Sequence, residues 1–116
     1  MGQQLQQQQL LKQQDLTIPE IIREYGKQFR QIQMQYSDGQ NGRCAMGVIM
    51  SYFGWNDKDD FGASKKLLRR AFTALTQAGV GKDLVIQLNN SGMSFDKIAD
   101  YLDQLHELNS IDLVEY

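Results

Sequence analysis

Ten residues in the middle of the chain, Cys44-Ala-Met-Gly-Val-Ile-Met-Ser-Tyr-Phe53, are apolar almost all round. A segment of this kind is buried on every side, either as a central helix or as a buried strand. Methionine and alanine favour the helix, and Gly54 stands where helices commonly end. We therefore expect a central helix with the remaining elements packed around it.

An amphipathic helix is predicted before this segment. Thr17 and Glu20 have the spacing of a capping box, and Pro19 is tolerated in a first helical turn. Apolar residues then recur at spacings of three and four, which places them on one helix face: Ile18, Ile22, Tyr25, Phe29, Ile32 and Tyr36. We expect this helix to end at the turn-forming residues 37–42.

Further helices are predicted after the central segment. One covers residues 63–78 and stops at Gly79. Residues 84–88 suit a helix capped by Asp83, since no second strand is evident to pair with them. Ser94 is the expected N-cap of a last long helix, whose apolar face holds Phe95, Ile98, Ala99, Leu102, Leu105 and Leu108. Residues 109–116 add a short helix or a tail.

These elements predict an all-α fold, a compact bundle of four to five short helices in a single domain over residues 16–116. Residues 1–15 are different, because eight glutamines fall within the first fourteen positions. Such a composition is typical of a disordered, flexible tail. A coiled-coil arm is the alternative, but Leu5, Leu10 and Leu11 form no sustained heptad.

Composition favours a soluble, cytoplasmic protein. The chain of 116 residues has one cysteine, and none of its apolar runs approaches the roughly 18 residues of a membrane span. No secretory signal is evident at the N-terminus. Charge is segregated: residues 20–82 hold ten basic and six acidic residues, whereas residues 83–116 hold one basic and seven acidic residues.

Four acidic residues of the last predicted helix share one face, Asp96, Asp100, Asp103 and Glu107. Like charges at spacings of three and four repel by roughly 0.2–0.5 kcal/mol per pair. A purely solvated face is one interpretation. The other is a docking strip for a basic partner, which could be this protein's own basic face, within the fold or across a dimer.

That basic face is predicted on the helix over residues 63–78, where Lys65, Lys66, Arg69 and Arg70 lie opposite the apolar residues. Four positive charges on two turns suit phosphate binding, although a pI near 5.2 argues against a free-standing DNA-binding protein. Residues 92–102 also look like the opening helix of a helix-turn-helix unit. The stretch that would follow is short and acidic, which disfavours DNA recognition.

A catalytic cysteine is a third hypothesis. Cys44 is expected at a helix N-terminus, where the helix dipole lowers a thiol pKa, and its surroundings faintly resemble the nucleophile helix of papain-like cysteine peptidases. His106 is the only histidine that could act as its base. A buried structural cysteine is the alternative that we favour.

No metal ion or cofactor is expected. The segment 57–62 resembles the start of a calcium loop, but Phe61 and Leu68 stand where oxygen ligands are required.

Two segments together resemble a group of small uncharacterised proteins from bacterial and phage genomes. They are Arg43-Cys-Ala-Met-Gly-Val48 and Leu88-Asn-Asn-Ser-Gly-Met-Ser-Phe-Asp-Lys-Ile-Ala-Asp-Tyr-Leu102. The group pairs a Cys-x-Leu-Gly-like segment with a Leu-Asn-Asp-x-Gly-x-Ser-Phe-x-x-Ile-Ala-like segment. Asn90 replaces the acidic residue of that pattern, and the glutamine-rich tail lies outside it. The resemblance implies no activity.

The sequence therefore predicts a small helical interaction protein without catalytic activity. A protein partner or a second copy of the chain is expected to bind the acidic strip or the basic helix. Nucleic-acid binding through the basic helix is the alternative, and a cysteine-dependent enzyme is the third hypothesis.

Overall fold

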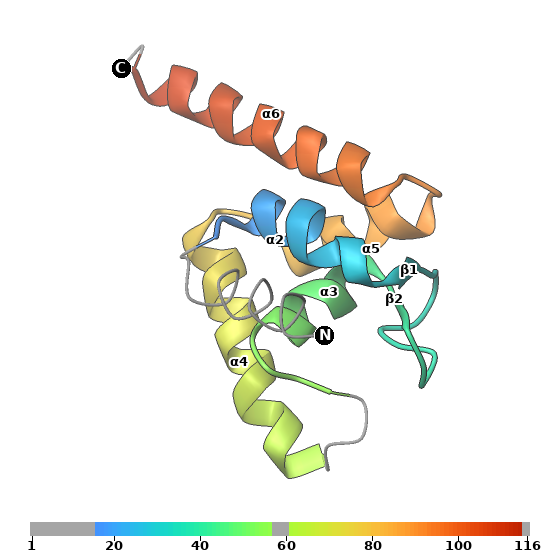
Figure 1. Ribbon diagram of the computed structural model, residues 1–116. Helices are drawn as coiled ribbons and strands as arrows, with labels where there is room; N and C mark the ends of the chain where they lie inside the picture. Colours follow the sequence, from blue (N-terminus) through green and yellow to red (C-terminus); the bar gives the residue numbers. More distant parts are fainter. Residues whose placement is uncertain (1–15, 57–60, 115–116) are drawn as a thin grey trace, which may run out of the picture.

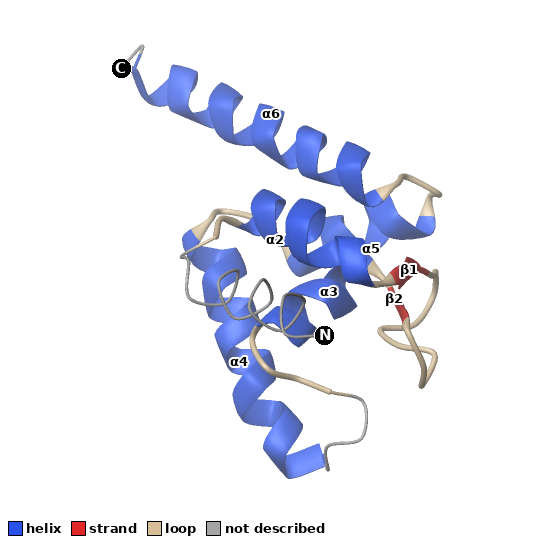
Figure 2. Ribbon diagram, in the orientation of Figure 1, coloured by secondary structure: helices blue, strands red, loops and turns tan. Residues whose placement is uncertain are grey.

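The computed structural model describes residues 16–56 and 61–114, apart from the side chains of residues 61–64, 66, 67 and 108–114. Helices dominate the described chain, as Figure 2 shows. In chain order the elements are α2 (Ile18–Glu24), η1 (Tyr25–Gln28), β1 (Arg30–Gln31), β2 (Gly42–Arg43), α3 (Ala45–Tyr52), α4 (Phe61–Gln77), α5 (Lys82–Asn90) and α6 (Phe95–Val114). The predicted all-α fold is confirmed, while the predicted tail over residues 1–15 lies outside the described residues.

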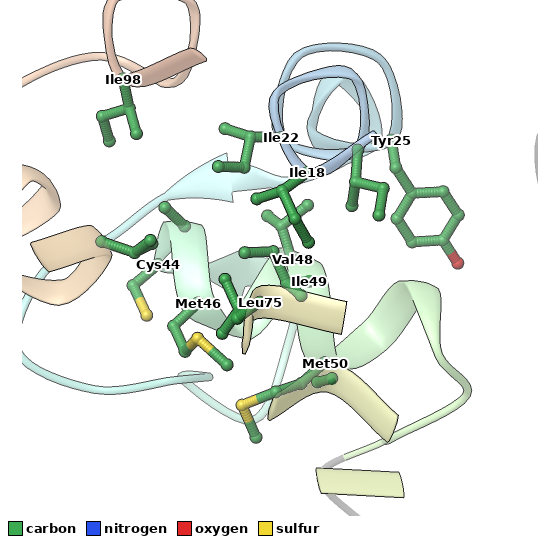
Figure 3. Close-up of a cluster of buried hydrophobic side chains, with 14 of the residues drawn as sticks. Ile18, Ile22, Tyr25, Cys44, Met46, Val48, Ile49, Met50, Leu75 and Ile98 are labelled. Carbon is green, nitrogen blue, oxygen red and sulfur yellow. The ribbon is translucent and has the colours of Figure 1, made fainter. Parts of the chain in front are cut away.

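Helix α3 is the centre of the molecule, as predicted (Figure 1). It packs against α2, η1, β2, α4 and α5, and every residue from Ala45 to Ser51 is buried. Figure 3 shows apolar side chains of α2, α4 and α6 converging on it. Because α3 is apolar on all sides, each neighbouring helix can bury its own apolar face against it.

The first helix is much shorter than predicted. The capping box forms, with the Glu20 N–H donating to Thr17 Oγ1 and the Thr17 N–H donating to Glu20 Oε1. However, α2 ends at Glu24, and the chain passes through η1 into an extended segment at Phe29. The expectation of one helix reaching Tyr36 is therefore wrong.

Contacts with distant parts of the chain explain this early end. A Cβ atom on Gly26 would lie 3.0 Å from the Phe95 ring, so the start of α6 packs directly on the backbone of η1. Beyond η1, β1 pairs in parallel with β2, a two-residue pairing that the sequence did not predict. Ending the helix removes helical backbone hydrogen bonds. Two others partly replace them, because the Arg30 N–H donates to the Asn41 carbonyl and the Ile32 N–H donates to the Arg43 carbonyl.

The buried side chain of Asn89 joins three elements at the end of α5. Its Oδ1 accepts hydrogen bonds from the Ala45 N–H at the start of α3 and from Gln31 Nε2 in β1, at 3.0 and 2.9 Å. Its Nδ2 donates to the Ile32 carbonyl at 2.7 Å. Asn89 lies just beyond the helix predicted over residues 84–88, and the structure places it, fully buried, in the last turn of α5.

We predict that Asn89→Ala lowers the free energy of unfolding by roughly 3 kcal/mol, because it leaves buried backbone groups without partners. Asn90→Ala is the matched control, since the Asn90 side chain is only half-buried and accepts a hydrogen bond from the exposed Met34 N–H. It is expected to cost about 1 kcal/mol or less. Urea denaturation followed by circular dichroism measures both, and equal losses would contradict the assigned role of Asn89.

The other helices begin near the predicted positions, but α6 continues to Val114, where a separate short helix or a tail was expected from residue 109. Helix α4 stops before Gly79, whose φ of 72° lies in the left-handed region, and Ser94 Oγ accepts the Lys97 N–H at the start of α6. Residues 84–88 are helical as predicted, although Gly81 rather than Asp83 is the N-cap of α5. No helix in the described part of the chain is both long and apolar enough to cross a membrane.

The loop between β1 and β2 is held in a strained form at Met34. Met34 has a φ of 70°, a conformation that side chains with a Cβ rarely adopt, and its side chain is 81% exposed. Asn89 and Asn90 of α5 hold this backbone, through the Ile32 carbonyl and the Met34 N–H. The end of α5 therefore fixes both the position and the strain of this loop.

We predict that Met34→Gly raises the free energy of unfolding by roughly 1 kcal/mol, because glycine adopts a positive φ without strain. Gln35→Gly, at the next exposed position and without a positive φ, should instead lower it by about 0.5–1 kcal/mol. The two variants are compared by urea denaturation. A loss of stability in both would show that Met34 stores no strain.

Candidate functional site

The acidic strip, which we define as Asp96, Asp100, Asp103 and Glu107, lies exposed along α6. Ile98, Ala99 and Leu102 of the same helix are buried and attach α6 to the body of the protein. The strip therefore presents its carboxylates from a helix that is packed in the fold.

Arg23 of α2 binds the middle of the acidic strip. Its Nη2 atom lies 2.8 Å from Asp100 Oδ1 and 3.1 Å from Asp103 Oδ2. The hydrogen bond that Arg23 donates to Asp103, together with the one it donates to Asp100, raises the pKa of Arg23 above its usual value. The side chains of Asp100 and Asp103 remain 66% and 51% exposed, so both carboxylates can still accept hydrogen bonds from a partner.

The predicted basic face lies on α4. Lys65, Arg69 and Arg70 are exposed there, while the side chain of Lys66 lies outside the described residues. Among the described side chains, the ion pairs of the acidic strip are made with Arg23 and not with this basic face. The basic face was one expected partner of the strip within the fold, but α2 provides that partner instead.

An apolar groove of about 370 Å³ lies beside the acidic strip. Its walls come from three elements: the start of α2, the end of α4 with the turn that follows, and α6. Asp103 and His106 of α6 lie on its wall, together with Leu16, Thr17, Ile18, Pro19, Ala74, Gln77, Ala78, Val80 and Leu102. One acidic residue of the strip thus belongs to an apolar hollow as well.

The acidic strip could be predicted from the sequence, but the groove could not. The acidic strip is a pattern within one helix, so its spacing can be read directly. The groove needs the relative placement of residues near 16, 78 and 103, which no local pattern reports. The one available signal was that the apolar residues Leu16 and Val80 lie outside the predicted helices.

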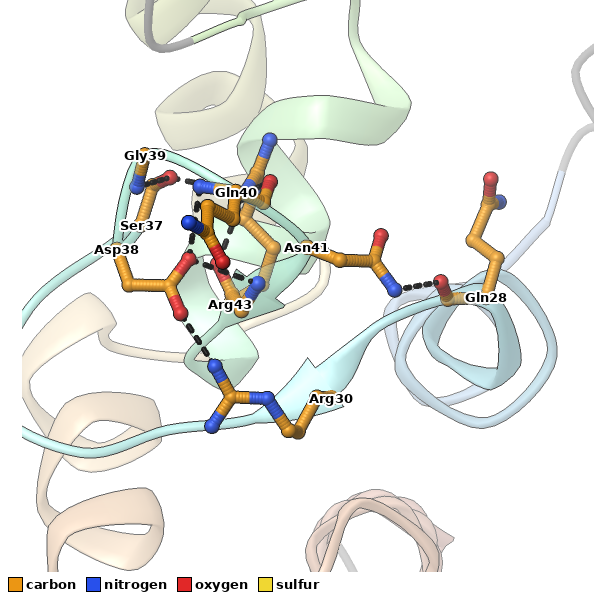
Figure 4. A network of polar contacts seen from close by, with 9 residues as sticks. Gln28, Arg30, Ser37, Asp38, Gly39, Gln40, Asn41 and Arg43 are labelled. Atoms are coloured by element: carbon orange, nitrogen blue, oxygen red, sulfur yellow. Dashed lines mark hydrogen bonds and ion pairs between the residues drawn. The ribbon is translucent and has the colours of Figure 1, made fainter.

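Arg43 forms a second polar centre, buried beneath the loop between β1 and β2 (Figure 4). Only 7% of it is exposed, and its guanidinium donates to Ser51 Oγ, Ser37 Oγ and the carbonyls of Gln40 and Gly42. The rings of Phe29 and Trp55 face it at 5.0 and 5.8 Å. No described carboxylate forms an ion pair with Arg43, so neutral oxygens and aromatic rings stabilise this charge.

Asp38 shapes the same loop from outside. It accepts hydrogen bonds from the N–H groups of Gln40 and Gly42 and pairs with Arg30. The two backbone donors hold the pKa of its carboxyl below the usual value. The loop then crosses α3 at Gly47, where a Cβ atom would lie 2.1 Å from the Tyr36 carbonyl oxygen. The contacts of Arg43 and Asp38 therefore stabilise the conformation of the loop between β1 and β2.

Cys44 is buried, as the structural interpretation predicted. It caps α3, and its Sγ accepts the Gly47 N–H at 3.4 Å. Only 4% of the residue is exposed, and burial raises the pKa of the thiol. The expectation that the helix N-terminus lowers this pKa is therefore wrong, because desolvation outweighs the hydrogen bonds. Cys44 and His106 also line different hollows.

We predict that native Cys44 reacts with iodoacetamide at least roughly tenfold more slowly than free cysteine, because its thiol is buried and protonated. The same protein in concentrated guanidinium chloride should react at the rate of free cysteine. Reaction of the native protein faster than free cysteine would indicate an activated thiolate and would favour the hypothesis of a cysteine-dependent enzyme.

Two other motifs remain from the sequence. Residues 57–60 of the calcium-loop-like segment lie outside the described residues. The helix-turn-helix hypothesis required a separate helix after Leu102, but α6 continues without a break to Val114. The two helices flanking the turn at residues 91–94 are α5 and α6, so the acidic α6 would have to enter the major groove, where phosphates repel it.

Comparisons of the chain with models of protein families, with curated proteins and with solved structures found no match. The acidic strip and the groove beside it are therefore the features that indicate a function.

Proposed function

We propose that this protein is an interaction module that binds a positively charged segment of another protein through the acidic strip on α6. The observation that carries the proposal is the contact of Arg23 with Asp100 and Asp103. Two carboxylates already bind one guanidinium in the geometry that a partner's arginine would need, and both remain more than half exposed.

Asp96 and Glu107 support the proposal from the two ends of the strip. Both are exposed, and neither forms an ion pair with a described residue. Their spacing along α6 extends the negative surface one turn beyond each side of the Arg23 contact. A basic segment that lies along α6 would therefore meet four carboxylates, two of them unneutralised.

The helical backbone of α6 also favours binding. It already holds the four carboxylates in one row, so that binding does not have to order the backbone of the strip, which reduces the cost of association. Opposite charge steers the encounter and makes it dependent on salt. This protein would thus select partners by charge pattern and recruit them quickly.

We expect Asp96→Asn/Glu107→Gln to weaken binding of a fluorescent peptide of alternating arginine and glycine by roughly three- to tenfold, since each exposed ion pair contributes about 0.2–1 kcal/mol. These substitutions leave the Arg23 contact intact. The control Asp83→Asn/Glu24→Gln also removes two charges, but outside the strip. Fluorescence anisotropy at low and high salt measures the binding.

Equal losses of peptide affinity in both double variants would contradict the proposal that the acidic strip is the binding site. Such a result would show that the affinity depends only on the net charge of the protein. Sedimentation equilibrium of the unlabelled protein tests whether the basic face of α4 in a second copy is the partner.

Binding of a single-stranded oligonucleotide that is lost in Arg69→Glu/Arg70→Glu would support the alternative, in which the basic face binds nucleic acid. Arg69, Arg70 and the half-buried Phe53 line an open hollow there, which favours that alternative.

A further inference from the structure

The groove beside the acidic strip is shaped for apolar side chains. Its wall is built largely from aliphatic groups of Leu16, Pro19, Ala74, Ala78, Val80 and Leu102. A volume of about 370 Å³ lies at the lower end of the roughly 300–1,000 Å³ typical of binding pockets. That space suits a few aliphatic side chains.

The groove and the strip form one continuous surface. Asp103 belongs to both, because it lines the groove and also binds Arg23. Glu107, one helical turn further along α6, extends the same negative edge. Among the described residues that line the groove there is no lysine or arginine, and His106 is the one basic side chain. The surface therefore combines an apolar floor with a negative edge.

We propose that the groove receives the apolar face of a basic amphipathic helix of a partner protein, whose lysines or arginines bind the acidic strip. This inference deepens the proposed function and depends on it. Helices bind in grooves through apolar residues spaced three and four apart, and basic residues beside them would face Asp103 and Glu107. Charge complementarity is what selects this partner over an acidic or neutral helix.

The chain's own basic helix does not fit the groove. The apolar face of α4 is already used in the core, where Ala71 and Leu75 are buried. In a second copy, α4 could offer its basic face to the strip, but its apolar residues Ala71 and Leu75 would not be available for the groove. The residues that precede Leu16, which include Leu10 and Leu11, are the other candidate occupant because the chain enters the groove at Leu16.

Three fluorescent peptides of equal length test the proposal on the full chain by anisotropy. One carries leucine at helical spacing with lysine elsewhere, the second replaces each leucine with alanine, and the third replaces each lysine with glutamate. We expect the leucine–lysine peptide to bind at least about tenfold more tightly than the other two. Ala78→Trp fills the groove and should remove this advantage, without changing the binding of the alanine–lysine peptide.

Gln87→Trp is the matched control, since Gln87 is exposed on α5 and does not line the groove. It should leave the binding of every peptide unchanged, and thermal denaturation checks that both tryptophan variants fold. Equal affinity for the leucine–lysine and alanine–lysine peptides, with binding still weakened by Asp96→Asn/Glu107→Gln, would overturn the groove proposal but keep the strip. Binding insensitive to that double variant would instead overturn the proposed function.

Two other occupants of the groove, the N-terminal segment and a second copy of the chain, would each give a different result in these experiments. Tighter binding of the leucine–lysine peptide by Leu10→Gln/Leu11→Gln would show that the N-terminal segment fills the groove, which overturns the proposal. A dimer in sedimentation equilibrium that Ala78→Trp abolishes would assign the groove to a second copy, with the same consequence.

Discussion

The buried carboxamide of Asn89 is the interaction on which the rest of the structure depends. It joins the start of α3, the strand β1 and the end of α5 by hydrogen bonds to Ala45, Gln31 and Ile32. Asn89 and Ala45 are buried, and Gln31 and Ile32 are half-buried. Water therefore cannot readily replace a missing partner, and losing one of these hydrogen bonds weakens the others. Asn89 places the loop of Met34 on one side and the turn into α6 on the other.

The sequence predicted those parts of the fold that local interactions determine. The capping box at Thr17, the apolar helix α3, the stop at Gly79 and the cap at Ser94 all depend on residues a few positions apart. Residues 25–36 were mispredicted because their apolar spacing also fits a helix. Their actual structure depends on Gln31 reaching Asn89, 58 positions away, and on Phe95 packing at Gly26. Tertiary contacts of this kind override local propensity.

The same distinction applies to the candidate site. Four carboxylates on one helix face follow from spacing alone, and the structure places them on one exposed surface. Their contact with Arg23 and the groove beside Asp103 require two or three elements to come together. The Cys44 thiol illustrates a competition that sequence cannot decide, because a helix N-terminus and burial shift its pKa in opposite directions. The degree of burial, visible only in the fold, determines the outcome.

The contact between α2 and α6 has a consequence for the order of folding. These two helices pack more extensively on each other than any other pair of described elements, although one begins at Ile18 and the other ends at Val114. Contacts between segments that are far apart in a chain slow its folding. During synthesis, the surface of α2 that packs on α6 therefore stays uncovered until α6 has been made. A nascent or truncated chain that lacks α6 would expose this surface and would be prone to aggregate through it.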